Sequence, residues 1–225
     1  MRRLIIAVIV LFLCTVSVSA EASDSAIYRR VENADMKIAL TFDDGPHPYY
    51  TDRILGILDK YGIKATFFFV GQNIENYPEQ AKHVREGGHE VGNHTYTHHR
   101  VRAMNETELA AELEKCDDLI YELGEYGTRL FRPPEGAFDE AAENIARKMD
   151  YSVILWSVDT KDWAHQSPSD IVKNVLGNVR GGDIILMHDY IGFDSPTPEA
   201  LEAMLPKLLE MGYEFVTVSE LMAER

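Results

Sequence analysis

The chain has 225 residues, 45% of them hydrophobic and 26% charged, which suits one globular domain with a full core. Its formal net charge of -15 repels nucleic acid and other anionic polymers, so no nucleic-acid partner is expected. Only Cys14 and Cys116 occur, and the first lies in a segment that is expected to be removed, so packing and not disulfide bonds must stabilise the fold.

The first twenty residues have the pattern of a secretory signal peptide. Arg2 and Arg3 precede an apolar run, and small residues lie just before Glu21, where cleavage is expected. The apolar run is short for a membrane span, which needs roughly 20 residues, although an uncleaved anchor is the alternative. The sequence therefore predicts a signal peptide over 1–20, an extension over 21–36 and one folded domain over 37–225, in a secreted or cell-envelope protein.

Apolar runs alternate with amphipathic stretches along the rest of the chain. Seven strands are predicted, at 38–42, 66–70, 90–93, 130–132, 153–156, 184–187 and 214–217. Six helices are predicted, at 50–60, 78–86, 106–123, 139–148, 168–178 and 198–210. Asn105 and Glu108 have the spacing of a capping box at the start of the third helix. This alternation is typical of a parallel α/β sheet.

Two short motifs suggest a metal site. Asp43 and Asp44 follow the first predicted strand in the motif TFDDGP, and His94 and His98 follow the third with an i, i+4 spacing. One helical turn would point such a histidine pair in the same direction. Either motif alone is more often an ordinary turn or a solvated pair. Together they offer one carboxylate and two imidazoles, a ligand set that suits hydrolytic Zn²⁺, and a second carboxylate free to act as a base.

Further polar residues also lie where predicted strands end. Arg132 ends the fourth strand, Asp162 comes soon after the fifth, and His188 follows the sixth. Active sites built from the carboxyl ends of many strands are typical of α/β barrels. The arrangement therefore favours a barrel over an open, doubly wound sheet.

Five ordered motifs resemble those of the polysaccharide deacetylase family, whose domain is also called the NodB homology domain or carbohydrate esterase family 4. They are TFDDGP at 41–46, HTYTH at 94–98, RPPEG at 132–136, DW at 162–163 and LMH at 186–188. The resemblance extends from Lys37 to Thr217. It implies a distorted (β/α) barrel of about seven parallel strands that hydrolyses acetyl groups on carbohydrate with one divalent metal ion, usually Zn²⁺, with Co²⁺ or another divalent ion as alternatives.

The resemblance also implies a role for individual residues. Asp44, His94 and His98 would bind the metal. Asp43 would act as the base, held in place by Arg132. His188 would act as the acid, oriented by Asp162. Leu186 and Trp163 would form the walls of the pocket for the acetyl methyl group.

One position departs from the family pattern. The third motif commonly carries Tyr where this chain has Glu135, and the resemblance gives the backbone N–H of this residue the role of oxyanion donor. A backbone role survives a change of side chain, but the added carboxylate would lie near developing negative charge or near a substrate hydroxyl. We hypothesise that Glu135 contacts substrate and tunes specificity.

The sequence thus predicts a secreted, metal-dependent carbohydrate N-deacetylase. Its expected partner is an N-acetylated glycan, either peptidoglycan or a chitin-type oligosaccharide, and no protein partner is implied. One alternative is an esterase that removes O-acetyl groups from xylan or muramic acid. The other is a glycan-binding envelope protein with an attenuated site.

Overall fold

The computed structural model describes residues 27–124, 127–137, 139–192 and 194–224. The predicted signal peptide over 1–20 and its cleavage position before Glu21 lie outside these ranges. Among the described residues, no helix has both the length and the apolar character needed to cross a membrane.

The strands form one curled parallel sheet in the order β1-β6-β5-β4-β3-β2-β8-β7, with β9 paired to β2. Their bounds are β1 Ile27–Tyr28, β2 Lys37–Asp43, β3 Thr66–Phe69, β4 Glu90–Asn93, β5 Leu130–Phe131, β6 Ser152–Ile154, β7 Val158–Asp159, β8 Ile184–His188 and β9 Glu214–Phe215. An isolated antiparallel bridge between Arg30 and Asp183 joins the segment after β1 to the start of β8. The sheet thereby curls into a distorted barrel.

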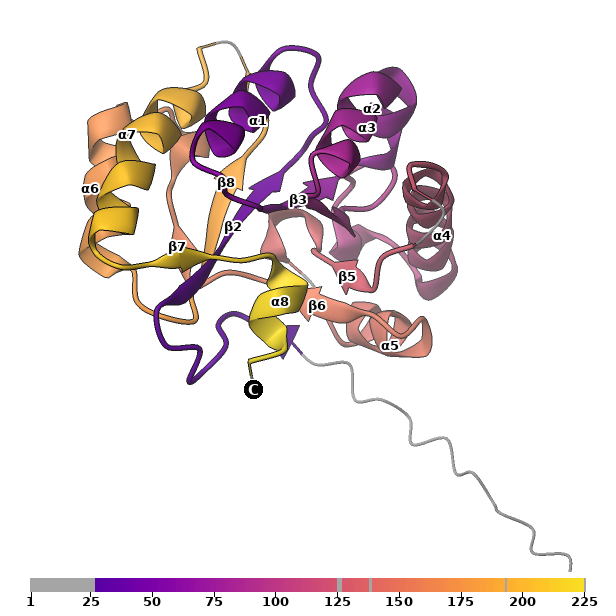
Figure 1. Cartoon of the computed structure of the whole chain (residues 1–225). Helices are drawn as coiled ribbons and strands as arrows, with labels where there is room; N and C mark the ends of the chain where they lie inside the picture. The colour runs from indigo at the N-terminus through magenta and orange to yellow at the C-terminus, as the bar shows by residue number, and fades with distance from the viewer. Residues whose placement is uncertain (1–26, 125–126, 138, 193, 225) are drawn as a thin grey trace, which may run out of the picture.

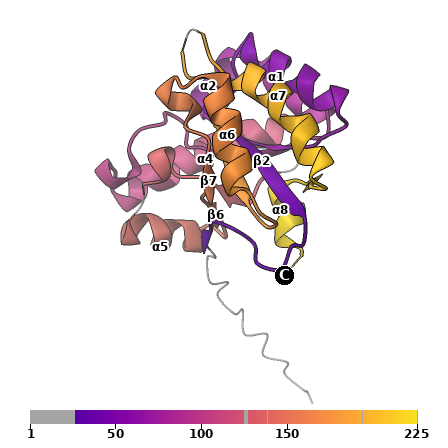
Figure 2. The ribbon, with the colours of Figure 1, turned by 90° about the vertical axis from the view of Figure 1, so that its left-hand side faces the viewer.

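Helices cover the outside of the curled sheet (Figure 1). Their bounds are α1 Tyr50–Lys60, α2 Gly71–Asn76, α3 Pro78–Glu86, α4 Glu106–Glu122, α5 Glu140–Lys148, α6 Pro168–Asn178, α7 Thr197–Glu210 and α8 Val218–Met222. On one flank α7 packs against both α6 and α1, as Figure 2 shows. Three short 3₁₀ helices, η1 Val101–Ala103, η2 Pro134–Gly136 and η3 Asp162–Ala164, lie in the connections.

The pleat of β2 decides which of its side chains enters the barrel. Successive side chains of a strand point to opposite faces, and Leu40 and Phe42 pack outward in the main core with the helices. Ala39 belongs to a second apolar cluster inside the curl. Asp43 shares the inward face of Ala39, so its carboxylate lies inside the barrel at the carboxyl end of the strand.

The opposite end of the barrel is closed by α8. The Val218 N–H donates to Thr66 Oγ1 at the start of β3, at 2.9 Å, and Val218 and Leu221 are fully buried in the inner apolar cluster. This end is therefore filled and apolar. Only the carboxyl end, where the loops follow the strands, is left to form a polar cleft.

The fold prediction is confirmed as a single-domain α/β barrel, with local differences. The short strands β1 and β7 and the short helices α2 and α8 were not predicted. Elements of two to six residues give a weak periodic signal, although the equally short strands β5 and β9 were predicted. Strand β1 lies within the predicted N-terminal extension, where Tyr28, Val31 and Ala34 are buried. The capping box of Asn105 and Glu108 is present at the start of α4.

Candidate active site

The polar residues gather in a cleft of about 540 Å³ at the carboxyl end of the barrel. Its lining comprises Asp43, Asp44, His94, His98, Glu135, Trp156, Asp159, Trp163, Leu186 and His188. Eight of these are residues that the sequence predicted for the site. The other two predicted residues, Arg132 and Asp162, are fully buried and bond to the lining from behind.

Asp44 leaves the line of β2 through a left-handed backbone conformation. Its φ is 70°, in a region that non-glycine residues rarely adopt. The Asn73 side-chain amide donates to the Asp44 carbonyl oxygen at 2.8 Å and holds this turn. The two adjacent carboxylates consequently point in different directions, with Asp43 inward under the cleft and Asp44 toward the histidines.

His94 and His98 lie in a loop after β4, so the predicted helical turn is wrong. The loop includes two left-handed residues, Thr95 with φ 67° and His98 with φ 58°. It is held by hydrogen bonds from the Thr97 N–H and hydroxyl to Glu112 Oε2, at 2.7 and 2.9 Å. The backbone reversals bring the two imidazole rings together, with centroids 4.9 Å apart.

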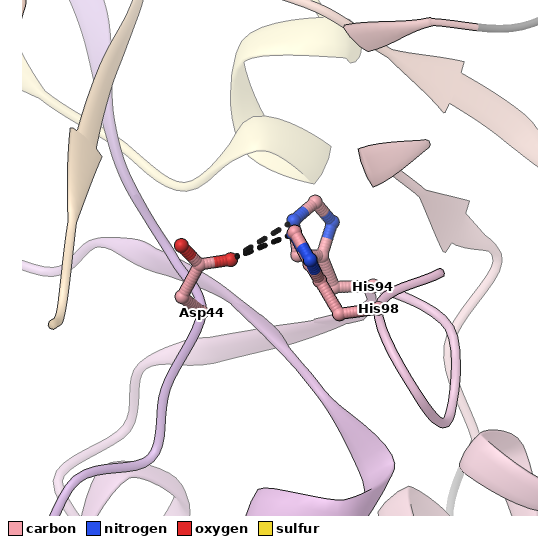
Figure 3. A group of neighbouring side chains, drawn as sticks. All are labelled: Asp44, His94 and His98. Atoms are coloured by element: carbon pink, nitrogen blue, oxygen red, sulfur yellow. Dashed lines mark ion pairs between the residues drawn. The ribbon is translucent and has the colours of Figure 1, made fainter. Parts of the chain in front are cut away.

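The three predicted metal ligands converge, as Figure 3 shows. Asp44 Oδ1 lies 3.4 Å from His94 Nε2 and 3.0 Å from His98 Nε2, and the three ligand atoms all lie within 4.8 Å of one another. Within the described residues, the buried Asp44 Oδ1 accepts no hydrogen bond of good geometry. A buried carboxylate oxygen between two imidazole nitrogens is a donor set that fits a divalent cation.

The electrostatics of this cluster agree with a cation site. The Nδ1 atom of His94 donates to the Arg132 carbonyl oxygen at 2.7 Å, which leaves the Nε2 lone pair free to ligate. Burial disfavours the ionised carboxylate of Asp44, but the neighbouring imidazoles of His94 and His98 outweigh burial and lower its pKa. Asp44 is therefore ionised, as a ligand must be.

Arg132 holds Asp43 from below the cleft. The guanidinium is fully buried and donates to Asp43 Oδ1 at 2.7 Å and to Thr41 Oγ1 at 2.7 Å. It also donates to the carbonyl oxygens of Ile154 and Leu155, each at 3.1 Å. These four bonds fix the cation beneath Asp43. Thr41 lies in the first motif, but its role in seating Arg132 was not predicted.

His188 and Asp162 form the opposite side of the cleft. Asp162 begins η3, and its Oδ1 lies 2.8 Å from His188 Nδ1 while its Oδ2 accepts the His188 backbone N–H at 2.7 Å. Burial disfavours the charged imidazole, but the hydrogen bond to Asp162 and its charge outweigh burial and raise the pKa of His188 to about 9. Protonated His188 therefore directs Nε2 away from Asp162 with a proton to give.

Apolar side chains form the walls between these two sides. Leu186 is 3% exposed and Trp163 is 53% exposed, and both line the cleft as the sequence predicted. The Trp163 indole donates to Asp159 Oδ1 at 3.3 Å. Trp156 and Asp159 also line the cleft but were missed, because neither belongs to a recognisable motif.

Glu135 lies at the rim of the cleft in η2 with φ 58°. Its carboxylate forms an ion pair with Arg100, with the Arg100 Nε atom 3.1 Å from Glu135 Oε2. The sequence placed this carboxylate near developing negative charge, and the structure shows that a cation accompanies it. The ion pair joins the loop after β4 to the loop after β5.

Other histidines stand apart from the cluster of metal ligands. His99 Nδ1 bonds the Thr97 hydroxyl at 2.8 Å and lines a separate cavity beside α4. His47 Nδ1 accepts the backbone N–H groups of Tyr49 and Tyr50, and its ring stacks on Tyr190 at 4.2 Å. Both were left out of the predicted site, and neither joins the cluster of Asp44, His94 and His98.

The barrel and the cleft, with the buried carboxylate of Asp43 on one side and the partly buried His188 on the other, have the arrangement of a hydrolase. The family model described as polysaccharide deacetylase matches residues 30–154. The chain belongs to this family, and its relatives named as deacetylases are hydrolases that act on carbon–nitrogen bonds other than peptide bonds.

Known proteins resemble the chain over nearly its whole length. A peptidoglycan-N-acetylglucosamine deacetylase of Bacillus cereus is 40% identical over 195 residues, covering 85% of this chain and 91% of the relative. The solved structure of the Bc1960 peptidoglycan N-acetylglucosamine deacetylase matches with a TM-score of 0.85 and 34% identity, covering 88% of this chain and 93% of that one.

A third relative is described differently. The structure of BA3943 from Bacillus anthracis, named as a CE4 family pseudoenzyme, matches with a TM-score of 0.83 and 34% identity, covering 89% of this chain and 70% of that one. The fold by itself therefore does not establish activity. The chemistry of the cleft must carry that conclusion.

Proposed function

We propose that this protein is a secreted, metal-dependent glycan N-deacetylase that releases acetate and leaves a free amine on peptidoglycan. The observation that carries the proposal is the pairing of Asp43 and His188. The two residues are register partners on β2 and β8, and both side chains line the same cleft. Asp43 is held by a buried cation and His188 by a buried carboxylate, which suits one as base and the other as acid.

Asp44, His94 and His98 would hold the metal ion. When bound there, a divalent cation, Zn²⁺ by its preference for this donor set, polarises the acetyl carbonyl and activates water. Asp43 accepts a proton from the attacking water, and Arg132 keeps its carboxylate in place. The backbone N–H of Glu135 donates to the acetyl oxygen as negative charge develops.

His188 then completes the reaction on the opposite side. Its Nε2 donates a proton to the sugar nitrogen as the carbon–nitrogen bond breaks, so the leaving group departs as a neutral amine. Asp162 stabilises the imidazolium before transfer. Leu186 and Trp163 contact the acetyl methyl group and exclude larger acyl groups. The products are acetate and the amino sugar.

The test is acetate release by protein that begins at Glu21 and is loaded with zinc. N-acetylglucosamine oligomers, intact peptidoglycan and O-acetylated xylan are offered in parallel, with Asp43→Asn as the control and the bound metal quantified. Release from peptidoglycan above the control supports the proposal. Release from the xylan ester alone would replace it with the O-acetyl esterase function.

A second candidate is a glycan-binding protein with an attenuated site. Its support is the relative named as a pseudoenzyme, together with the Glu135 carboxylate at the rim of the cleft. Binding of peptidoglycan by metal-loaded protein, without acetate release from any substrate, would favour this function.

We also propose that Glu135 tunes substrate choice through its ion pair with Arg100. The Glu135→Tyr variant removes the carboxylate and restores the residue common in the family, while Arg100→Gln removes only its partner. A changed ratio of kcat/KM between chitin oligomers and peptidoglycan in both variants is expected. An unchanged ratio in Glu135→Tyr would refute this role.

A further inference from the structure

The Asp162 carboxylate receives one hydrogen bond from outside the predicted motifs. Thr197 Oγ1 donates to Asp162 Oδ2 at 2.8 Å, and both side chains are fully buried. Among the described residues, the other donors to this carboxylate are the Trp163 N–H at 2.9 Å and the two nitrogens of His188. Thr197 lies 35 residues away in sequence from Asp162 and is the first residue of α7.

Each oxygen of the carboxylate has a different set of partners. Asp162 Oδ1 faces the His188 imidazole, and Oδ2 is held between the His188 N–H and the Thr197 hydroxyl. The carboxylate cannot rotate about its terminal bond without breaking both bonds to Oδ2. Loss of the hydroxyl would leave a buried carboxylate oxygen with a single donor, which is unfavourable in a dry interior.

The proton of the Thr197 hydroxyl is also directed toward Asp162. The Ser195 hydroxyl lies 3.2 Å from Thr197 Oγ1 as a donor, and Ser195 is 4% exposed. Because Thr197 accepts from Ser195, its own proton is free to go to Asp162. The Ser195 N–H in turn donates to the Tyr50 hydroxyl at 3.3 Å, which ties this segment to α1.

We propose that Thr197 is a positioning residue for the acid of the reaction: its hydroxyl fixes Asp162 Oδ2, and Asp162 thereby aligns His188. This role rests on the proposed deacetylase function. Through Thr197, the outer helix α7 helps to position the acid of the active site. The carboxylate lies beside the amino end of this 14-residue helix, whose dipole favours a negative charge there.

The test compares Thr197→Val, which keeps the shape and removes the hydroxyl, with Thr197→Ser, which keeps the hydroxyl. We expect Thr197→Val to lower kcat for amide hydrolysis about 10-fold, with KM unchanged, because a hydrogen bond to a buried charge is lost. An aryl acetate ester, whose leaving group needs no proton, should lose less than about 3-fold. Thr197→Ser should retain the amide activity.

Two controls separate positioning from a structural effect. Thr128→Val removes a buried hydroxyl that bonds the Leu130 N–H, away from the cleft, and should leave both activities unchanged. In a His188→Ala background, Thr197→Val should cause no additional loss of amide hydrolysis. Equal losses on amide and ester, or a further loss without His188, would overturn the proposal.

A spectroscopic readout keeps the inference testable without turnover. The His188 Nδ1–H proton resonance should shift in zinc-loaded Thr197→Val and not in Thr197→Ser, because only the first variant frees Asp162 Oδ2. If the wild-type protein releases no acetate, the deacetylase function fails, and the resonance alone decides whether Thr197 orders Asp162 and His188. An unshifted resonance in Thr197→Val would refute the coupling.

Discussion

The two sides of the cleft differ in the sign of the buried charge that supports the proton-transferring residue. On one side the anion Asp43 lies on the buried cation Arg132, and on the other the imidazole His188 lies on the buried anion Asp162. Each proton-transferring group is thus supported by a partner of opposite charge that is itself fully buried. The two groups therefore take opposite roles because of their buried partners: Arg132 supports a carboxylate that accepts a proton, and Asp162 supports an imidazolium that gives one.

The two sides also differ in how they are assembled. The side that carries Asp43 and the metal ligands is made of short loops directly after strands, shaped by left-handed residues at Asp44, Thr95 and His98. The acid side combines β8, η3 and the start of α7 through hydrogen bonds between distant segments. We expect changes on the first side to act mainly on chemistry and metal binding, and changes on the second to act through alignment.

The largest effect should come from Asp43→Asn. Loss of the base is expected to lower kcat about 1,000-fold while zinc remains bound, because Asp43 is not among the ligands. His94→Ala should lose both activity and zinc. Acetate release and metal content, measured on the same preparations, check this pair of variants. If Asp43→Asn lost zinc and His94→Ala kept it, the assignment of Asp43 as base and His94 as ligand would be wrong.

Arg132→Met should cause the largest loss of stability on the base side. It removes a fully buried cation and leaves Asp43 without its partner, which should lower the free energy of unfolding by about 3 kcal/mol. The exposed Arg180 is the matched control, and Arg180→Met should change the free energy of unfolding by less than about 0.5 kcal/mol. Urea denaturation measures both variants. Similar values for the two would mean that the buried pair contributes little.

The acid side should show a pH dependence of stability in metal-free protein. The folded-state pKa of His188 is raised from 6.5 to about 9. A raised pKa means that the protonated form stabilises the fold fully below pH 6.5, and that this contribution is lost as the pH rises through about 9. The difference in unfolding free energy between wild type and His188→Ala should therefore shrink across this window. Parallel curves would contradict the coupling to Asp162.

The smallest effect on stability should come from the rim of the cleft. Arg100 and Glu135 form their ion pair with side chains 75% and 51% exposed. Arg100→Ala should therefore change the free energy of unfolding by less than about 1 kcal/mol. Thermal unfolding at physiological ionic strength and with about 0.5 M salt measures the contribution of this ion pair to stability. The added salt shortens the Debye length by roughly twofold and so weakens surface pairs. A larger loss would mean that the pair holds the two loops together.

The base side was largely predictable from the sequence. The motifs at 41–46 and 94–98 name their residues directly, and a carboxylate at the inward end of β2 follows from the alternation of that strand. The predicted helical turn at His94 to His98 was wrong, because spacing alone does not distinguish a helix from a loop with left-handed residues. The two imidazole rings lie together as predicted, but a loop and not a helical turn brings them together.

The parallel α/β architecture, the position of the polar residues at strand ends and the identity of the candidate ligands were all predictable from the sequence, because these features depend on local periodicity and short motifs. Three contacts are visible only in the folded protein: Arg132 is buried under Asp43, Glu135 pairs with Arg100, and Thr197 donates to Asp162. These contacts join residues between 35 and 89 positions apart. No local pattern marks them, because they arise only when the curled sheet and its outer helices bring distant segments together.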